Sequence, residues 1–123
     1  MVGRTLYALL VWAALHGSVV ECGYAPHYSA GLMKKVALRR DISPVSCMVS
    51  RPRGPLGGWV WVYGVNTQTL LRCKIVDVSA PRDLARHVRT KRIAELSFEV
   101  TAALCGRTDE RVIDCPIVTV GVK

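Results

Sequence analysis

The sequence has little negative charge. Nine Asp and Glu residues stand against 17 Lys and Arg residues, which gives a formal net charge of +8 over 123 residues. Such a balance favours an anionic partner: nucleic acid, an acidic polymer or an anionic lipid surface. The alternative is that the excess of positive charge only keeps the protein soluble. Half of the residues are hydrophobic, which excludes a disordered chain, and the length allows one domain.

Several chemical signatures are also missing. No two cysteines have the Cys-x-x-Cys spacing of a zinc site or a thioredoxin-like centre. Nothing resembles a glycine-rich phosphate loop or the nucleophile elbow of a serine hydrolase. His87 has no partner His or Cys at ligand spacing, so it is a poor candidate metal ligand. We therefore expect neither a metal nor a cofactor.

The N-terminal residues predict an export signal. Arg4 supplies a positive start, and residues 6–15 (LYALLVWAAL) form an apolar run. This run has the length of a signal-peptide core and is too short to span a bilayer. The alternative is a buried N-terminal helix, which the absence of a polar face disfavours. We expect a protein that is secreted or periplasmic and that keeps no membrane insertion after the signal is removed.

The site of cleavage stays open between two positions, after Gly17 and after Cys22. We assign residues 1–22 to the signal peptide and residues 23–123 to the mature domain. A cut after Cys22 leaves four cysteines, an even number that suits two disulfides in an oxidising compartment. Three pairings of these four are open, and Cys22 is an odd thiol if it survives. The four cysteines are Cys47, Cys73, Cys105 and Cys115.

The middle of the chain predicts a β-hairpin. Residues 59–63 (WVWVY) alternate aromatic and valine side chains, and residues 70–78 (LLRCKIVDV) are a second long β-prone run beyond a turn. Both faces of the first strand are apolar, which predicts a core on one side and a cover or ligand on the other. Residues 51–58 (RPRGPLGG) have turn chemistry. Residues 23–34 indicate a loop or edge strand, and two short runs, 36–38 and 45–49, are β-prone.

The second half of the chain mixes short helices and strands. Pro81 opens a short helical turn that runs to about residue 87, and residues 92–96 are a strand candidate. Ser97 and Gly106 suit the two ends of a further helix, and a strand follows over residues 114–122, with Pro116 indicating an edge or a bulge. Four apolar residues recur at helical spacing and predict the buried face of that helix. They are Leu96, Val100, Ala103 and Leu104.

Two segments resemble a known family. Residues 73–83 (CKIVDVSAPRD), followed by residues 91–106 (KRIAELSFEVTAALCG), resemble the double-psi β-barrel of the barwin, expansin and rare-lipoprotein-A type. Residues 23–28 (GYAPHY) are similar to the first strand of that family. The resemblance implies an all-β fold, a six-stranded double-psi β-barrel with one or two short helices. It also implies cell-wall polysaccharide of the peptidoglycan type as partner, since family members bind it or, as lytic transglycosylases, cleave it.

The resemblance implies two candidate catalytic carboxylates, Asp77 and Glu95. Glu95 stands where the family has Asp, and Ile93 stands where expansins have His. Cleavage of a glycosidic bond needs at least one carboxyl group to protonate the leaving oxygen, and burial that raises its pKa helps. Nearby cations would lower that pKa. The alternative is structural: Asp77 pairs with an arginine and Glu95 is solvated.

The basic stretch after residue 81 is the candidate grip on an anionic polymer. With helical spacing, Arg82, Arg86 and Arg89 share one side. The alternative for such a run is a solvated face. Trp59 and Trp61 could stack on sugar rings, although aromatic residues of a strand more often belong to the core. The substrate-binding candidates are Tyr28, Arg82, Asp83, Arg86, His87 and Arg92.

The sequence therefore predicts an exported, monomeric protein that binds cell-wall polysaccharide or another anionic polymer. Whether it also cleaves the polymer is open. The alternative is a secreted interaction protein, an effector or inhibitor, that has the same barrel without its chemistry. The missing His and the exchange of Asp for Glu favour this second hypothesis. Nucleic acid is not expected as a partner, because only the net charge supports it and an export signal argues against it.

Overall fold

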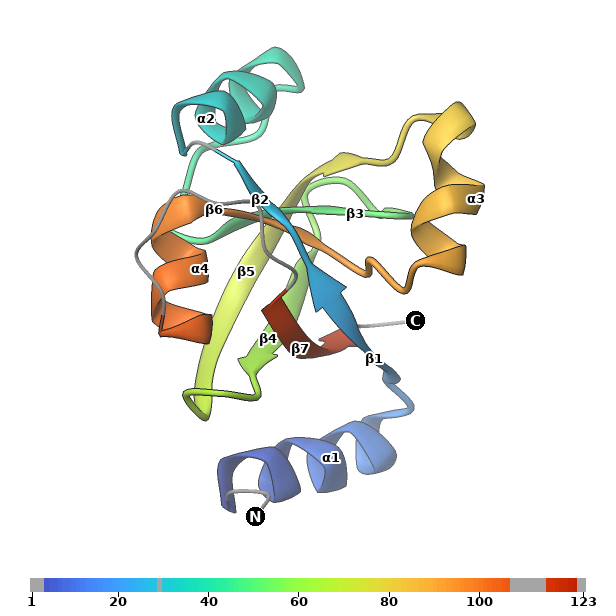
Figure 1. Cartoon of the computed structure of the whole chain (residues 1–123), viewed down its shortest axis with the longest axis vertical. Coiled ribbons are helices and arrows are strands. Elements are labelled where there is room, and N and C mark those ends of the chain that lie inside the picture. Colours follow the sequence, from blue (N-terminus) through green and yellow to red (C-terminus); the bar gives the residue numbers. More distant parts are fainter. Residues whose placement is uncertain (1–3, 29, 107–114, 122–123) are drawn as a thin grey trace.

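One curled, mixed β-sheet organises the chain (Figure 1). The computed structural model describes residues 4–28, 30–106 and 115–121. Its strands, in chain order, are β1 (Val19–Ala25), β2 (His27–Tyr28), β3 (Met48–Arg51), β4 (Trp59–Gly64), β5 (Thr69–Val78), β6 (Glu95–Ser97) and β7 (Cys115–Gly121). They lie in the order β1-β7-β4-β5-β3-β6-β2. The β3–β5 and β2–β6 pairs are parallel and the others antiparallel.

Four short helices lie around the sheet within the described residues. They are α1 (Arg4–His16), α2 (Ala30–Arg39), α3 (Pro81–Arg89) and α4 (Phe98–Cys105). The strand-rich fold that the sequence predicts is confirmed, but the sequence predicted one or two helices and not four. Figure 1 shows α2, α3 and α4 at different sides of the curled sheet and α1 at the bottom of the view, where the chain leads into β1.

The two outer strands of the sheet, β1 and β2, are consecutive pieces of chain separated by Pro26. β1 pairs with β7 along its whole length, and β2 pairs with β6. Tyr24 donates its backbone N–H to the carbonyl of Lys91 (2.8 Å), and Ile93 donates to the carbonyl of Tyr24 (3.0 Å). The same stretch of chain therefore contacts the last strand on one side and the segment around residues 91–97 on the other, as a strongly curled sheet requires.

The predicted hairpin is confirmed, and so is its two-sided burial. β4 and β5 pair antiparallel from Trp59–Lys74 to Gly64–Thr69. Val60 and Val62 belong to the main core, whereas Trp61 and Tyr63 pack in a second cluster. This second cluster contains Leu6, Leu9 and Ala13 of α1 and Val118 and Val120 of β7. The cover on the outer face of β4 is thus α1.

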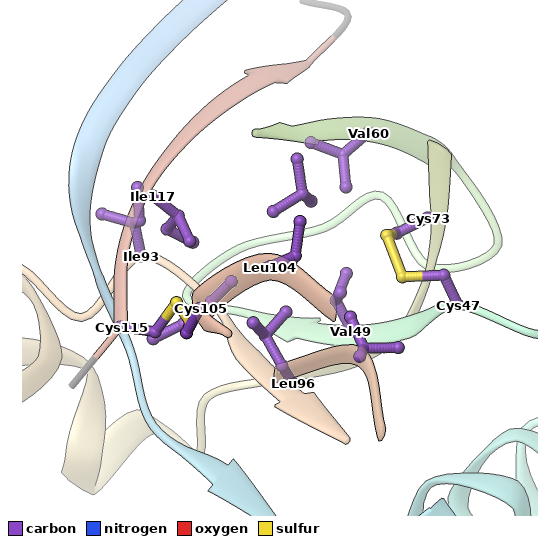
Figure 2. Packing of buried hydrophobic residues seen from close by; sticks show 14 of the residues in the cluster. Cys47, Val49, Val60, Cys73, Ile93, Leu96, Leu104, Cys105, Cys115 and Ile117 are labelled. Carbon is purple, nitrogen blue, oxygen red and sulfur yellow. A yellow bond between two sulfur atoms is a disulfide. The ribbon is translucent and has the colours of Figure 1, made fainter. Parts of the chain in front are cut away.

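Two disulfides border the main core (Figure 2). They join Cys47 to Cys73 and Cys105 to Cys115, and Cys22 is a free, exposed thiol. The prediction that these four cysteines form two bridges is confirmed. Bridges of this kind form and persist in oxidising compartments, so the protein belongs outside the reducing cytoplasm. No helix among the described residues is both long enough and apolar enough to cross a membrane.

Helix α4 begins and ends where the sequence predicts. Ser97 Oγ accepts a hydrogen bond from the backbone of Val100, and Gly106 adopts φ 71° as the C-cap. The predicted buried face is wrong at Ala103, which is exposed. Thr101 is buried in its place, because its hydroxyl donates to the carbonyl of Ser97 (3.0 Å) and is thereby satisfied.

Three further predictions were wrong in part. Residues 36–38, predicted as β-prone, lie in α2, where Met33 and Ala37 pack one turn apart on the sheet. Residues 23–34, predicted as a loop or edge strand, contain the end of β1 and all of β2, which are the outer strands of the sheet, but also the start of α2. Pro116 is not at a sheet edge: β7 has β1 on one side and β4 on the other. It is tolerated because it is the second residue of its strand. The ends of the predicted last strand, 114 and 122, lie outside the described residues.

The N-terminal segment reaches into the sheet. β1 begins at Val19, so a cut after Gly17 would leave this strand whole, whereas a cut after Cys22 would remove its first four residues. α1 has apolar side chains on both faces: one packs on the sheet, and Tyr7 and Leu15 on the other are exposed. The assignment of residues 1–22 to a signal peptide stays a prediction.

Candidate anion-binding cavity

A cavity of about 770 Å³ opens beside β1, the turn after β3 and the end of α3. Its wall is strongly basic: six of the lining residues are Arg51, Arg53, Arg72, His87, Lys91 and Arg92. Glu21 is the one carboxylate among the described residues that line it. Clustered cations in a concave site raise the local concentration of anions. The cavity therefore favours a negatively charged ligand.

Arg51, the last residue of β3, is largely buried, with a side chain that is only 11 % exposed. Its Nη2 donates to Glu21 Oε1 (3.0 Å), while Nε and Nη1 are buried without a hydrogen-bond partner in the described structure. Burial lowers the pKa of the Arg51 guanidinium from its ordinary value, and the Glu21 carboxylate opposes this change. Arg51 is thus a fixed positive charge that one carboxylate compensates incompletely.

Trp59 lies at the wall of the same cavity and is 38 % exposed. The guanidinium carbon of Arg72 lies 4.5 Å from the centroid of its ring and Lys74 Nζ 5.6 Å, and these cation–π contacts orient the indole. Of the two tryptophans with a predicted sugar-stacking role, Trp59 is accessible at the cavity. Trp61 packs against the α1 cluster.

The two candidate catalytic carboxylates lie on strands that flank β3. Ser50 of β3 pairs with Asp77 of β5 on one side and with Glu95 of β6 on the other. Their side chains have different partners: Arg40 Nη2 lies 2.6 Å from Asp77 Oδ1, whereas Glu95 Oε1 lies 3.7 Å from His87 Nε2. Neither residue lines the cavity. The structural alternative holds for Asp77, which pairs with an arginine, but not for Glu95, whose side chain is partly buried beside His87.

His87 connects α3 with the sheet. It is buried, and a hydrogen bond joins its Nδ1 to Ser79 Oγ (2.6 Å) just beyond β5. Its other ring nitrogen faces Glu95. The ring is thereby held between two strand ends while it contributes to the cavity wall. Such a pair of polar partners accounts for the burial of a histidine.

The predicted basic stretch divides into two parts. His87, Lys91 and Arg92 line the cavity, whereas Arg82 and Arg86 lie on the exposed surface of α3. There Asp83 Oδ1 accepts a hydrogen bond from Arg86 Nη2 (3.2 Å), and Asp83 Oδ2 lies 3.8 Å from Arg82 Nε. Asp83 therefore offsets part of that surface charge. Tyr28 has its backbone in β2, and its side chain lies outside the described residues.

Sequence reasoning missed Glu21, Arg51, Arg53 and Arg72 as components of one site. The Arg-Pro-Arg of residues 51–53 was interpreted only as turn chemistry, although two arginines beside a proline were a visible signal. The other two residues come from distant strands, β1 and β5, and only the curling of the sheet brings them to the same cavity.

Among the described residues, no group of three or more His, Cys, Asp or Glu side chains has an arrangement that could hold a metal ion. No model of a protein family matches the chain, and no curated protein is detectably similar to it.

Proposed function

We propose that the protein is an exported module that binds an acidic cell-wall polysaccharide of the peptidoglycan type in the basic cavity. The observation that carries the proposal is the lining: five Arg and Lys side chains, His87 and a single carboxylate line a concavity of about 770 Å³. An extended anionic chain can engage several of these cations at once, and Trp59 offers an aromatic surface beside them.

We also propose that the curled sheet is a closed, six-stranded double-psi β-barrel, in which β1 and β2 count as one strand. The hydrogen bonds of Tyr24 to Lys91 and Ile93, and that of Leu96 to Pro26 (3.0 Å), support closure because they connect the two ends of the strand order. This is the fold that the sequence resemblance implies.

The cavity should bind the polymer more than the exposed surface of α3 does. We expect the double variant Arg53→Gln/Arg72→Gln to bind a soluble polyuronate at least about tenfold more weakly, since each charge-assisted hydrogen bond contributes about 1.5–3 kcal/mol. Arg82→Gln/Arg86→Gln removes the same charge from α3 and should stay within about threefold of the wild type, because salt screens charges outside the site. Affinity electrophoresis in gels with polyuronate or neutral dextran measures both. The reverse order of effects would place the site on α3.

The positions of the two candidate catalytic carboxylates, Asp77 and Glu95, support binding without cleavage. Asp77 is paired with Arg40 and does not line the cavity, so Asp77→Asn should leave polymer binding unchanged. We expect purified cell walls to release no soluble glycan fragments in the presence of the protein, as measured by mass spectrometry. Fragments that the wild type releases and that Glu95→Gln abolishes would instead show a lytic transglycosylase with Glu95 as its acid.

A protein target is the second candidate, an effector or inhibitor on the same scaffold. Glu95 and Ile93, which stand where the family that the sequence resembles has Asp and His, favour it. A protein partner would bind with unchanged affinity when polyuronate is added in excess. Competition by polyuronate would instead assign the interaction to the basic cavity.

A further inference from the structure

We infer that Glu21 is an internal ligand of the cavity and that carboxylate groups of the bound polymer displace it from Arg51. The inference rests on the proposed function and adds its ligand class, a carboxylate-bearing polymer such as a polyuronate. It requires Glu21 in the mature chain, so any cut must fall before β1, as a cut after Gly17 does.

The Arg51–Glu21 pair is asymmetric in burial. The Arg51 side chain is 11 % exposed, while that of Glu21 is 43 % exposed. The arginine is therefore fixed in the wall, whereas the carboxylate can turn into solvent by side-chain rotation alone. Its backbone stays in place, because Glu21 is paired with Thr119 in the β1–β7 ladder. The strand does not need to move for the site to open.

The charges around the pair favour exchange with an external anion. Glu21 is a single carboxylate, and the described structure shows Arg51 Nη2 as the donor to it. The exposed side chains of Arg53, Arg72 and Lys91 lie along the same cavity. A polymer that carries one carboxylate per sugar can pair with Arg51 and with these cations together, whereas Glu21 cannot. Exchange thus replaces one ion pair with several.

The exchange also provides selectivity. A neutral sugar offers Arg51 no charge, so it would leave this buried cation uncompensated when Glu21 turns away, at a cost in free energy. A carboxylate restores the pairing. Glu21 therefore discriminates against uncharged glycans and lowers the affinity for charged ones by its own competition.

The test compares three full-length proteins: the wild type, Glu21→Gln and Glu99→Gln. Glu99 is exposed at the start of α4, so its variant makes the same charge change outside the cavity. The probe is polygalacturonate, with dextran as the neutral polymer, in calorimetric titrations at fixed salt. We expect Glu21→Gln to bind polygalacturonate about tenfold more tightly than the wild type, which corresponds to the free energy of one exposed ionic hydrogen bond. The affinity of Glu99→Gln should stay within about twofold of the wild type.

A second measurement separates competition from a structural role. Without polymer, Glu21→Gln should melt at a lower temperature than Glu99→Gln, because Arg51 has lost its counter-ion, and saturating polygalacturonate should remove this difference. A variant that is less stable and also binds more weakly would overturn the inference, and so would equal affinity of the two variants. If the wild type binds neither polygalacturonate nor purified peptidoglycan, the proposed function fails. If it binds peptidoglycan alone, the proposed function stands and this inference fails at its ligand class. If it binds polygalacturonate and Glu21→Gln binds it with the same affinity as the wild type, only the role of Glu21 is refuted.

Discussion

An alanine at position 64 is expected to lower the free energy of unfolding by about 3 kcal/mol or more, which is a large part of the stability of a small domain. Gly64 ends β4, and a Cβ there would overlap the carbonyl oxygen of Leu104 and lie 2.7 Å from its carbonyl carbon. These are backbone atoms of α4, so no rotation of a side chain can relieve the overlap. The helix would have to move away from the strand.

Such a movement would also break the contacts that hold the end of α4. Thr67, in the turn after β4, donates its hydroxyl to the carbonyls of Ala103 (3.1 Å) and Leu104 (2.8 Å). The side chain of Leu104 is fully buried in the main core. The strain at Gly64 would therefore reach the core and the turn together.

Gly31→Ala is the matched control. Gly31 lies in α2, where an added Cβ meets no atom within 4 Å, so alanine should stabilise the protein by up to about 1 kcal/mol through helix propensity. Urea unfolding followed by tryptophan fluorescence measures both variants. A Gly64→Ala protein with the urea midpoint of the wild type would show that α4 does not approach β4 so closely.

Loss of the Cys47–Cys73 disulfide is expected to have the second large effect. The bond connects residues 26 apart in sequence, and the chain-entropy estimate for such a ring is about 3.5 kcal/mol. Both half-cystines are buried at the border of the main core (Figure 2), so Cys47→Ala/Cys73→Ala also removes packing. The Cys105–Cys115 ring spans 10 residues, for which the same estimate is about 2.7 kcal/mol.

The measurement is urea unfolding of each double variant with and without a reducing agent. The midpoint of the Cys47→Ala/Cys73→Ala variant should lie below that of the Cys105→Ala/Cys115→Ala variant. Cys22→Ser serves as control and should unfold as the wild type does, because Cys22 is exposed and free. An unchanged midpoint after loss of the Cys47–Cys73 pair would contradict the arrangement of the core described above.

The parts of the fold that the sequence predicted are those with short-range signals. The β4–β5 hairpin follows from alternation on both sides of a turn, and α4 follows from a Ser N-cap and a Gly C-cap. α2 was missed because its start overlaps a segment rich in turn residues. Its helical state depends on the packing of Met33 and Ala37 against Met48 and Val76, which local sequence cannot show.

The candidate site was predicted less well for a similar reason. The charged residues of the segment 82–92 are clustered in sequence. On α3, however, the side chain of His87 is buried, whereas those of Arg82 and Arg86 are exposed to solvent. Arg51 comes from the end of another strand, and its importance arises from burial beside Glu21. Neither burial nor that neighbour can be inferred from residue types alone.

The pairing of β1 with β7 also determines the order in which the domain can assemble. These strands come from opposite ends of the described chain and share a ladder of seven residue pairs. During synthesis β1 emerges early and has to wait for its partner until nearly all the other described residues have left the ribosome. Such distant pairing slows folding. The β1–β7 ladder, the part of the cavity wall at Gly121 and the bridge between Cys105 and Cys115 can form only after β7 has been synthesised.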